Sequence, residues 1–364
     1  MSEVVLQLTQ HGSATKIAWI GPFNRQYLAN TNSLNNASAN VRRILGQVAH
    51  EYAHGERSYA AYLRALARAG AGLASAIVTA ADGTFHGAVL SSLAKLPPET
   101  ALRIVTDGLE VPWNFVYAGA TPNEVEARGT LEDFKDFWLS RFKVRIRFSN
   151  TNDMPEPPIS RSRVRTLLAL HESRFRSAMD LLAENLPDLR DKVECLLEHQ
   201  IGSTNDWIDC EKKWREIEDN DSILYIFAHR DEEGRLSLKD NPLAADCDKY
   251  EISSDEFQAF FRKQNAVAAQ SNTLCFVNGC RTAAEGWGER LLSATSAVGF
   301  QGFIGSEAEI ASDLATRYAV EFLFALLKEG KSVDEAYEET KTKCFPMSLW
   351  YSCYAHPQFR ISRE

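Results

Sequence analysis

The sequence predicts an α/β protein whose core is a mostly parallel sheet flanked by helices. After about residue 160, short apolar segments alternate with longer segments of helical periodicity, the pattern of a parallel sheet covered on both faces. Residues 222–228 and 273–278 are apolar almost throughout, which is typical of strands buried on both sides. The expected strands are 164–170, 222–228, 273–278 and 302–305, and the expected helices are 178–199, 255–264 and 311–328.

The first part of the chain follows a different pattern and is expected to form a separate half. We expect strands at 4–8, 16–20, 102–105 and 142–148, an Asn/Ser-rich loop at 30–40, and helical structure over 41–71. Residues 149–162 contain three prolines among polar residues, which indicates a domain junction. The sequence therefore predicts two halves, 1–154 and 160–364.

Composition excludes several classes of function. A net charge of −9 and a pI of about 5.5 disfavour a nucleic-acid partner, and a mildly acidic protein attracts basic peptides more readily. The seven cysteines are scattered and form no C-x-x-C pair, as in proteins of a reducing compartment. Because neither a signal peptide nor an apolar run long enough to span a membrane is visible, we expect a cytoplasmic protein without a membrane partner.

Two of the expected strands end in residues that can form a catalytic pair. The apolar segment 223–228 leads into His229, and 273–278 leads to Cys280. Ligands of open parallel sheets bind at the carboxyl ends of the strands, so we expect both side chains to face one crevice. There, the imidazole can take the thiol proton and produce a thiolate that attacks a carbonyl carbon. The backbone N–H groups of Arg230 and Cys280 are expected to stabilise the resulting oxyanion.

Each of these two residues also has a plain structural interpretation. His229 alone fits a hydrogen-bonded histidine at a sheet edge, and Cys280 alone fits a small buried hydrophobic residue. Order and spacing favour the pair, since Cys280 lies 51 residues after His229, close to the separation of about 50 in caspases.

The segments around both residues carry a resemblance to a known family. These segments are 224–229, 234–238, 252–257, 277–283, 302–305 and 330–336, preceded by 102–115. Val277 to Ala283 reads Val-Asn-Gly-Cys-Arg-Thr-Ala, which is similar to a strand followed by a small-x-Cys-x-Thr-Ala nucleophile motif. Together they resemble the CHAT domain, a caspase-like cysteine peptidase family of clan CD that is related to separase.

The resemblance implies a fold, an activity and partners. It implies a caspase-like catalytic half at 160–364 and a related, non-catalytic half at 1–154. The implied activity is that of a regulated cysteine endopeptidase (a thiol protease) without a cofactor or metal, which cleaves a specific protein in bacterial antiviral defence or signalling. Because members of the family act with a sensor, a separate activator or sensor protein is the implied partner.

Two departures from the family pattern favour an alternative function. Arg230 stands where the family usually has glycine, and Ser306 to Glu309 replaces a usual tryptophan. The alternative is a catalytically impaired adaptor that keeps the fold for protein binding. Within the peptidase interpretation, Glu307, Glu309 and Asp313 are expected to line a substrate pocket that favours Lys or Arg. They are also compatible with simple stabilisation of a helix N-terminus.

A second alternative rests on a short motif near the N-terminus. His50-Glu51-Tyr52-Ala53-His54 matches H-E-x-x-H on a segment of helical periodicity. Two imidazoles one helical turn apart can bind zinc, with Glu51 as the base for a metal-bound water. Only 49 residues precede the motif, and the extension found in metzincins is absent, so we rank a zinc metallopeptidase below the cysteine peptidase.

Overall fold

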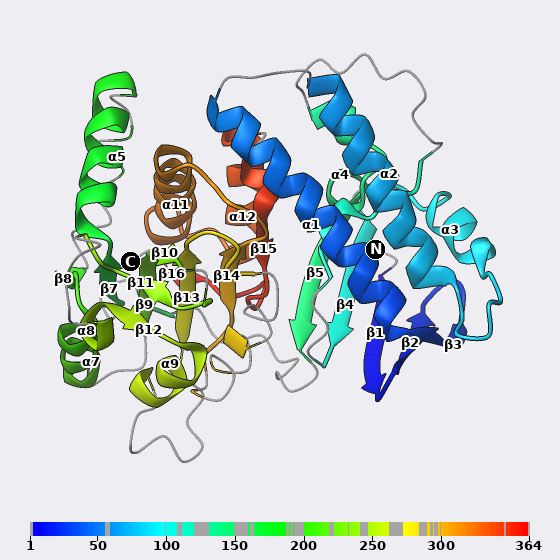
Figure 1. Cartoon of the computed structure of the whole chain (residues 1–364), viewed down its shortest axis with the longest axis horizontal. Coiled ribbons are helices and arrows are strands. Elements are labelled where there is room, and N and C mark those ends of the chain that lie inside the picture. Colours follow the sequence, from blue (N-terminus) through cyan, green and yellow to red (C-terminus); the bar gives the residue numbers. More distant parts are fainter. Residues whose placement is uncertain are drawn as a thin grey trace. The chain divides into compact units, whose positions relative to one another are not determined.

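A computed structural model of the chain contains two compact units, residues 1–150 (unit 1) and 151–364 (unit 2) (Figure 1). The structure describes residues 3–54, 59–98, 100–107, 111–119, 131–148, 159–160, 164–186, 189, 192, 200–217, 222–231, 233–240, 247–261, 272–283, 290–291, 294, 298, 300–345 and 347–362. The proline-rich junction expected at 149–162 lies almost wholly outside these residues. Among the described helices, none is both long and apolar enough to cross a membrane.

Unit 1 is built on a five-stranded sheet of order β3-β2-β1-β4-β5. Its strands are β1 (Val4–His11), β2 (Ala14–Ile20), β3 (Arg25–Asn30), β4 (Thr100–Thr106) and β5 (Phe142–Phe148). Strands β1, β4 and β5 are parallel, whereas β2 is antiparallel to its two neighbours. The longest helices are α1 (Thr31–His54) and α2 (Tyr59–Val78), which pack side by side (Figure 1) and are followed by α3 (Gly87–Leu93) and the short α4 (Trp138–Arg141).

The prediction of a loop at 30–40 is wrong, because α1 begins at Thr31. Asn30 caps this helix: its side-chain oxygen accepts a hydrogen bond from the backbone N–H of Ser33 at 3.1 Å. Leu34 and Ser38 lie one turn apart and are both buried. Tertiary packing of this face therefore outweighs the weak helix propensity of the Asn and Ser residues.

Unit 2 is built on a six-stranded sheet of order β15-β14-β13-β9-β7-β8. Its strands are β7 (Arg165–Leu170), β8 (Gln200–Thr204), β9 (Ser222–Phe227), β13 (Thr273–Asn278), β14 (Phe303–Ser306) and β15 (Tyr351–Cys353). All neighbouring strands are parallel except β14 and β15. After β7, the chain adds β8 on one side of this strand and then β9 on the other side. Ligands of such sheets bind at this switch point, so the carboxyl ends of β7 and β9 are the expected place for a site.

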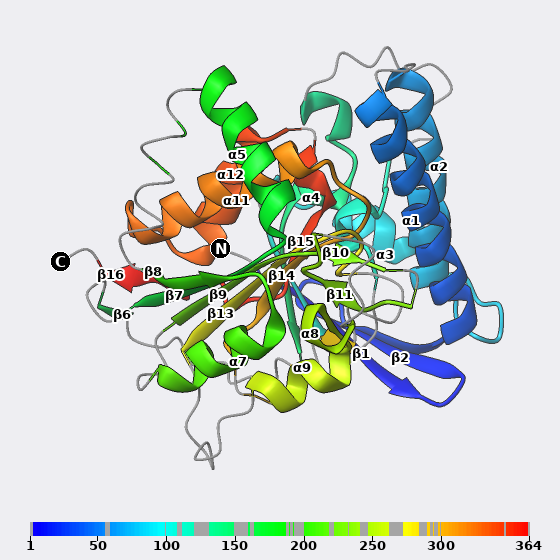
Figure 2. The same cartoon turned by 60° about the vertical axis from the view of Figure 1, so that its left-hand side comes forward.

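Helices cover both faces of the unit 2 sheet. Figure 2 shows α5, α11 and α12 on one side of the strands and α7 and α9 on the other. These helices are α5 (Glu172–Asn185), α7 (Trp207–Glu216), α9 (Ser254–Phe261), α11 (Ser312–Leu327) and α12 (Val333–Lys343). Every residue of β9 and β13 is buried. The predicted fold class, a mostly parallel sheet flanked by helices, is confirmed.

Three small elements complete unit 2 beside the main sheet. A three-stranded sheet joins β10 (His229–Arg230), β11 (Leu236–Ser237) and β12 (Glu251–Ile252), with the short helix α8 (Cys247–Tyr250) just before β12. A two-stranded parallel sheet pairs β6 (Ile159–Ser160) with β16 (Ile361–Ser362). The pairing of β6 with β16 joins the end of the described chain to the first described residues of unit 2.

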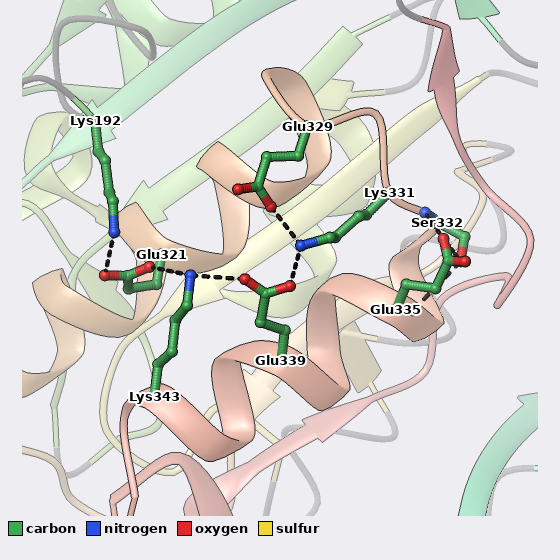
Figure 3. A network of polar contacts seen from close by, with 8 residues as sticks. All are labelled: Lys192, Glu321, Glu329, Lys331, Ser332, Glu335, Glu339 and Lys343. Carbon is green, nitrogen blue, oxygen red and sulfur yellow. Dashed lines mark hydrogen bonds and ion pairs between the residues drawn. The ribbon is translucent and has the colours of Figure 1, made fainter.

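A chain of alternating charges links α11 to α12 (Figure 3). Glu321 of α11 is only 7% exposed and contacts Lys192 at 2.7 Å and Lys343 at 3.3 Å. Lys343 also contacts Glu339 at 2.6 Å, and Glu339 in turn pairs with Lys331. Because a buried carboxylate is costly without partners, these contacts hold α12 and the side chain of Lys192 against α11.

Candidate active site

The two residues predicted as a catalytic pair follow neighbouring strands at the same level. Strands β9 and β13 are in register, with Phe227 opposite Asn278, so His229 and Cys280 each lie two residues beyond the last pair. Gly279 allows the strand ends to approach, because a Cβ at this position would lie 2.6 Å from the carbonyl oxygen of Ala228.

The structure brings His229 and Cys280 to one cavity, with a volume of about 40 Å³. The same cavity is lined by His171, Arg174 and Asn278, and by Ile310 from the segment after β14. His229 is exposed and Cys280 is partly buried. The site is therefore a small recess at the carboxyl edge of the sheet that is open to solvent on the histidine side.

The surroundings of Cys280 favour the neutral thiol. Burial raises the pKa of Cys280 above its ordinary value, and the nearby carboxylate of Glu309 acts in the same direction. A hydrogen bond from the backbone N–H of Ile310 and the charges of Arg174 and Arg281 oppose this rise in pKa. The thiol thus needs a base to become a nucleophile at neutral pH.

His229 is neutral under the same conditions and can act as that base. Partial desolvation at the cavity lowers the pKa of His229, and the charge of Arg174 lowers it further. Asp231 and Glu309 act in the opposite direction but do not cancel the effect. A neutral imidazole beside a neutral thiol is the protonation state from which general-base catalysis starts.

A second histidine, which our reading of the sequence did not single out, lies at the end of the adjacent strand. His171 directly follows β7, is 5% exposed and lines the cavity. Its Nδ1 atom is 2.9 Å from Oδ1 of Asp240, although the two are poorly aligned for a hydrogen bond. The same carboxylate oxygen accepts the backbone N–H of Ser173 at 2.9 Å. Because His171 follows an apolar strand just as His229 does, the same sequence signal could have found it.

Buried hydrogen bonds fix the end of β13. Asn278 is 1% exposed, and its Nδ2 donates to the hydroxyl of Tyr225 at 2.9 Å and to the carbonyl oxygen of Ala315 at 2.8 Å. Its Oδ1 accepts the hydroxyl of Tyr351 at 2.6 Å. These partners belong to β9, α11 and β15, so the position of Cys280 is set by three neighbouring elements.

Arg230, whose backbone N–H is one of the two predicted oxyanion donors, also makes a side-chain contact across the site. Its Nη1 donates to the carbonyl oxygen of Arg281 at 3.2 Å. Arg281 has a φ of 55°, a left-handed conformation that is uncommon outside glycine, and its guanidinium pairs with Glu309 at 3.1 Å. The residues that follow His229 and Cys280 are thereby tied to each other. The oxyanion role of the Arg230 and Cys280 N–H groups stays a prediction.

The three predicted pocket carboxylates do not line the cavity of the pair. Glu307 is 1% exposed and accepts a hydrogen bond from the hydroxyl of Ser352 at 2.6 Å. Glu309 is paired with Arg281. Asp313, in the first turn of α11, lines a separate pocket next to the cavity.

The zinc motif at 50–54 falls partly outside what the structure describes. His50 is exposed near the end of α1, and the side chains of residues 51–54 are not described. Among the described residues, no group of three His, Cys, Asp or Glu side chains is arranged to hold a metal ion. The zinc alternative stays a prediction.

Comparison with known proteins defines the fold. No protein-family model matches the chain, and no curated protein matches it. Among solved structures it is similar to the Saccharomyces cerevisiae separase–securin complex, with a TM-score of 0.50 and 7% sequence identity over 99% of this chain. The match covers only 30% of the yeast chain. The protein therefore has a separase-like α/β fold, which confirms the predicted resemblance at the level of fold.

Proposed function

We propose that the chain is a cysteine endopeptidase that cleaves a specific protein, with Cys280 as nucleophile and His229 as general base. One observation carries the proposal: the in-register ends of β9 and β13 lead to both residues, and both line one cavity. The separase-like fold supports it, since caspase-like peptidases share that architecture.

The reaction follows from the protonation states of the pair. His229 accepts the thiol proton as the sulfur of Cys280 attacks the peptide carbonyl carbon, and the carbonyl π electrons move to oxygen. Backbone N–H groups of Cys280 and Arg230 are the proposed donors to this oxyanion. The C–N bond then breaks, the leaving amine takes the proton from His229, and a thioester remains. Water then attacks the thioester carbonyl as His229 takes its proton, the C–S bond breaks, the carboxylic acid product leaves, and the sulfur takes the proton back from His229.

Regulation by a partner belongs to the same proposal. The cavity at Cys280 has a volume of only about 40 Å³, and burial raises the pKa of Cys280, so we expect the chain alone to react slowly. A separate activator or sensor protein would increase this rate, within a bacterial defence or signalling pathway. Both expectations rest on the resemblance to the CHAT domain.

A second candidate is an adaptor that keeps the fold without catalysis. Arg230 favours it, since it stands where the CHAT family usually has glycine, and its side chain contacts the carbonyl oxygen of Arg281, the residue after the nucleophile. The raised pKa of Cys280 favours it as well. An adaptor would bind its partner equally well with or without the thiol.

Cleavage of a peptide library by the full chain separates the two candidates. New N-termini are identified by mass spectrometry for the wild type, Cys280→Ala and His229→Ala. We expect a loss of more than about 10³-fold for Cys280→Ala and of about 10²- to 10⁴-fold for His229→Ala. Cys353→Ala is the matched control, because Cys353 is also partly buried but lies on β15 and does not line the cavity. Cleavage that persists in Cys280→Ala would exclude the peptidase function.

A further inference from the structure

The charged side chain that lines the cavity of the candidate catalytic pair is positive, whereas Glu309 and Asp231 act on the pair from outside this lining. Among the described residues that line the cavity of His229 and Cys280, the one permanently charged side chain is Arg174, and no carboxylate lines it. Glu307 is turned into the core and Glu309 is held by Arg281. The prediction of a carboxylate-lined pocket for Lys or Arg thus has no support at this cavity.

A second, larger pocket continues from the first between α5 and α11. It has a volume of about 340 Å³, large enough for a side chain, and lies open to solvent. Arg174 of α5 and Ser312 of α11 line both the cavity and this pocket, so they form the junction between the two. The outer wall is formed mainly by small or apolar side chains, among them Ser173, Ser177 and Leu181.

Arg174 is available to a ligand. It is exposed on the first turn of α5, and no ion pair joins it to another described residue. Its neighbour Arg176, by contrast, pairs with Glu172 on the same helix. The charge of Arg174 lowers the pKa of Cys280, of His229 and of His171, which means that its guanidinium lies within electrostatic reach of all three.

We propose that the α5–α11 pocket is a substrate subsite for an acidic side chain, Asp or Glu, next to the scissile bond. The inference rests on the proposed peptidase function. The guanidinium of Arg174 binds the substrate carboxylate through charge-assisted hydrogen bonds, and the hydroxyl of Ser312 donates a further one. Both are specificity-determining residues, because they contact the substrate at the junction that leads to Cys280.

Asp313 limits where the carboxylate can bind. It lines only the outer pocket, so an acidic group that moved beyond Arg174 would meet a like charge. The substrate carboxylate therefore stays at the Arg174 end, close to the nucleophile. Replacing Asp313 by Asn removes this repulsion and strengthens binding of an acidic side chain.

Peptide chloromethyl ketones test the subsite on the full chain. Three tripeptides that differ only in Glu, Gln or Lys beside the ketone are compared by the rate at which they modify Cys280, measured by intact-mass spectrometry. The wild type should react about tenfold faster with the Glu peptide than with the Gln peptide, and most slowly with the Lys peptide. Arg174→Gln should abolish the preference, and Arg174→Glu should reverse it. Asp313→Asn should raise the rate with the Glu peptide about twofold.

Arg176→Glu is the matched control, since it changes the same charge two residues away without touching either pocket. It should keep the wild-type preference. Equal rates for the Glu and Gln peptides in the wild type, or an unchanged preference in Arg174→Gln, would overturn the subsite. Reaction of Cys280 with iodoacetamide in the wild type and His229→Ala reports on the catalytic pair alone. A His229-dependent reaction without Glu preference contradicts only the subsite, whereas a His229-independent one contradicts the proposed function.

Discussion

The sheets of the two units differ in how they are buried. In β4 of unit 1 buried and half-buried residues alternate, whereas every residue of β9 and β13 in unit 2 is buried. The strand ends differ as well. In unit 1 the carboxylate of Asp107, just after β4, accepts a hydrogen bond from the backbone N–H of Gln10 at 2.9 Å and so stabilises the fold. In unit 2 three adjacent strands lead to His171, His229 and Cys280 around one cavity.

This difference shows where a reactive site can be held. A strand packed on both faces cannot shift without breaking contacts on both sides, so the residues after it are fixed in position. In β2 and β4 of unit 1, by contrast, buried residues alternate with residues that are mostly half-buried, so the second face is packed less tightly. This contrast agrees with the expectation that the catalytic residues lie in unit 2, and the non-catalytic role of unit 1 stays a prediction.

The largest expected effect contrasts a buried residue of the unit 2 sheet with a half-buried residue of the unit 1 sheet. Phe276 of β13 is fully buried, and its ring centroid lies 5.4 Å from that of Tyr225 and 6.0 Å from that of Tyr318. Phe276→Ala should destabilise unit 2 by about 3–5 kcal/mol, because it leaves a cavity between the sheet and α11. Val105→Ala in β4, on the half-buried face, should cost about 1 kcal/mol. Hydrogen exchange with mass spectrometry follows the two sheets separately, and equal losses of protection would contradict the comparison.

A smaller effect concerns acid stability of the helices behind the site. Hydrogen bonds from Lys331 and Lys343 lower the pKa of Glu339 below its usual value of 4.5. A carboxyl group whose folded-state pKa is depressed adds stability above its unfolded pKa, and this stability is lost as pH falls through the folded pKa. The melting temperature of unit 2 should therefore fall below about pH 4.5, and less steeply in Glu339→Gln. An identical pH dependence in the variant would show that the charge chain of Figure 3 contributes nothing to acid stability.

Sequence patterns predicted the parts of the molecule that local signals encode. The continuous apolar runs before His229 and Cys280 indicated buried strands, and the structure has them as β9 and β13. The alternation of apolar and basic residues in β5 was an equally clear signal, and this strand, Phe142–Phe148, was predicted with the bounds observed.

Other features depend on distant parts of the chain and could not be predicted. Residues 31–40 form the start of α1 because Leu34 and Ser38 are buried by tertiary packing. The orientation of Glu307 is set by Ser352, 45 residues later. Arg174 approaches the pair only because α5 begins directly after β7, whereas we expected that helix to begin at residue 178. The positive charge beside the pair could therefore not be predicted, because it depends on the residue at which α5 begins, and periodicity alone predicts the start of a helix poorly.

The most direct test of the account is the reactivity of Cys280 itself. Iodoacetamide is added to the full-length wild type and to His229→Ala over a range of pH, and each cysteine is followed by peptide mass spectrometry. We predict that Cys280 of the wild type is alkylated faster than the buried Cys275 and the partly buried Cys353 at neutral pH, and that His229→Ala slows it at least tenfold. Because its pKa is raised above the ordinary 9.0, the rate should continue to increase above pH 9. Alkylation of Cys280 at the same rate in both proteins would contradict a Cys280–His229 pair.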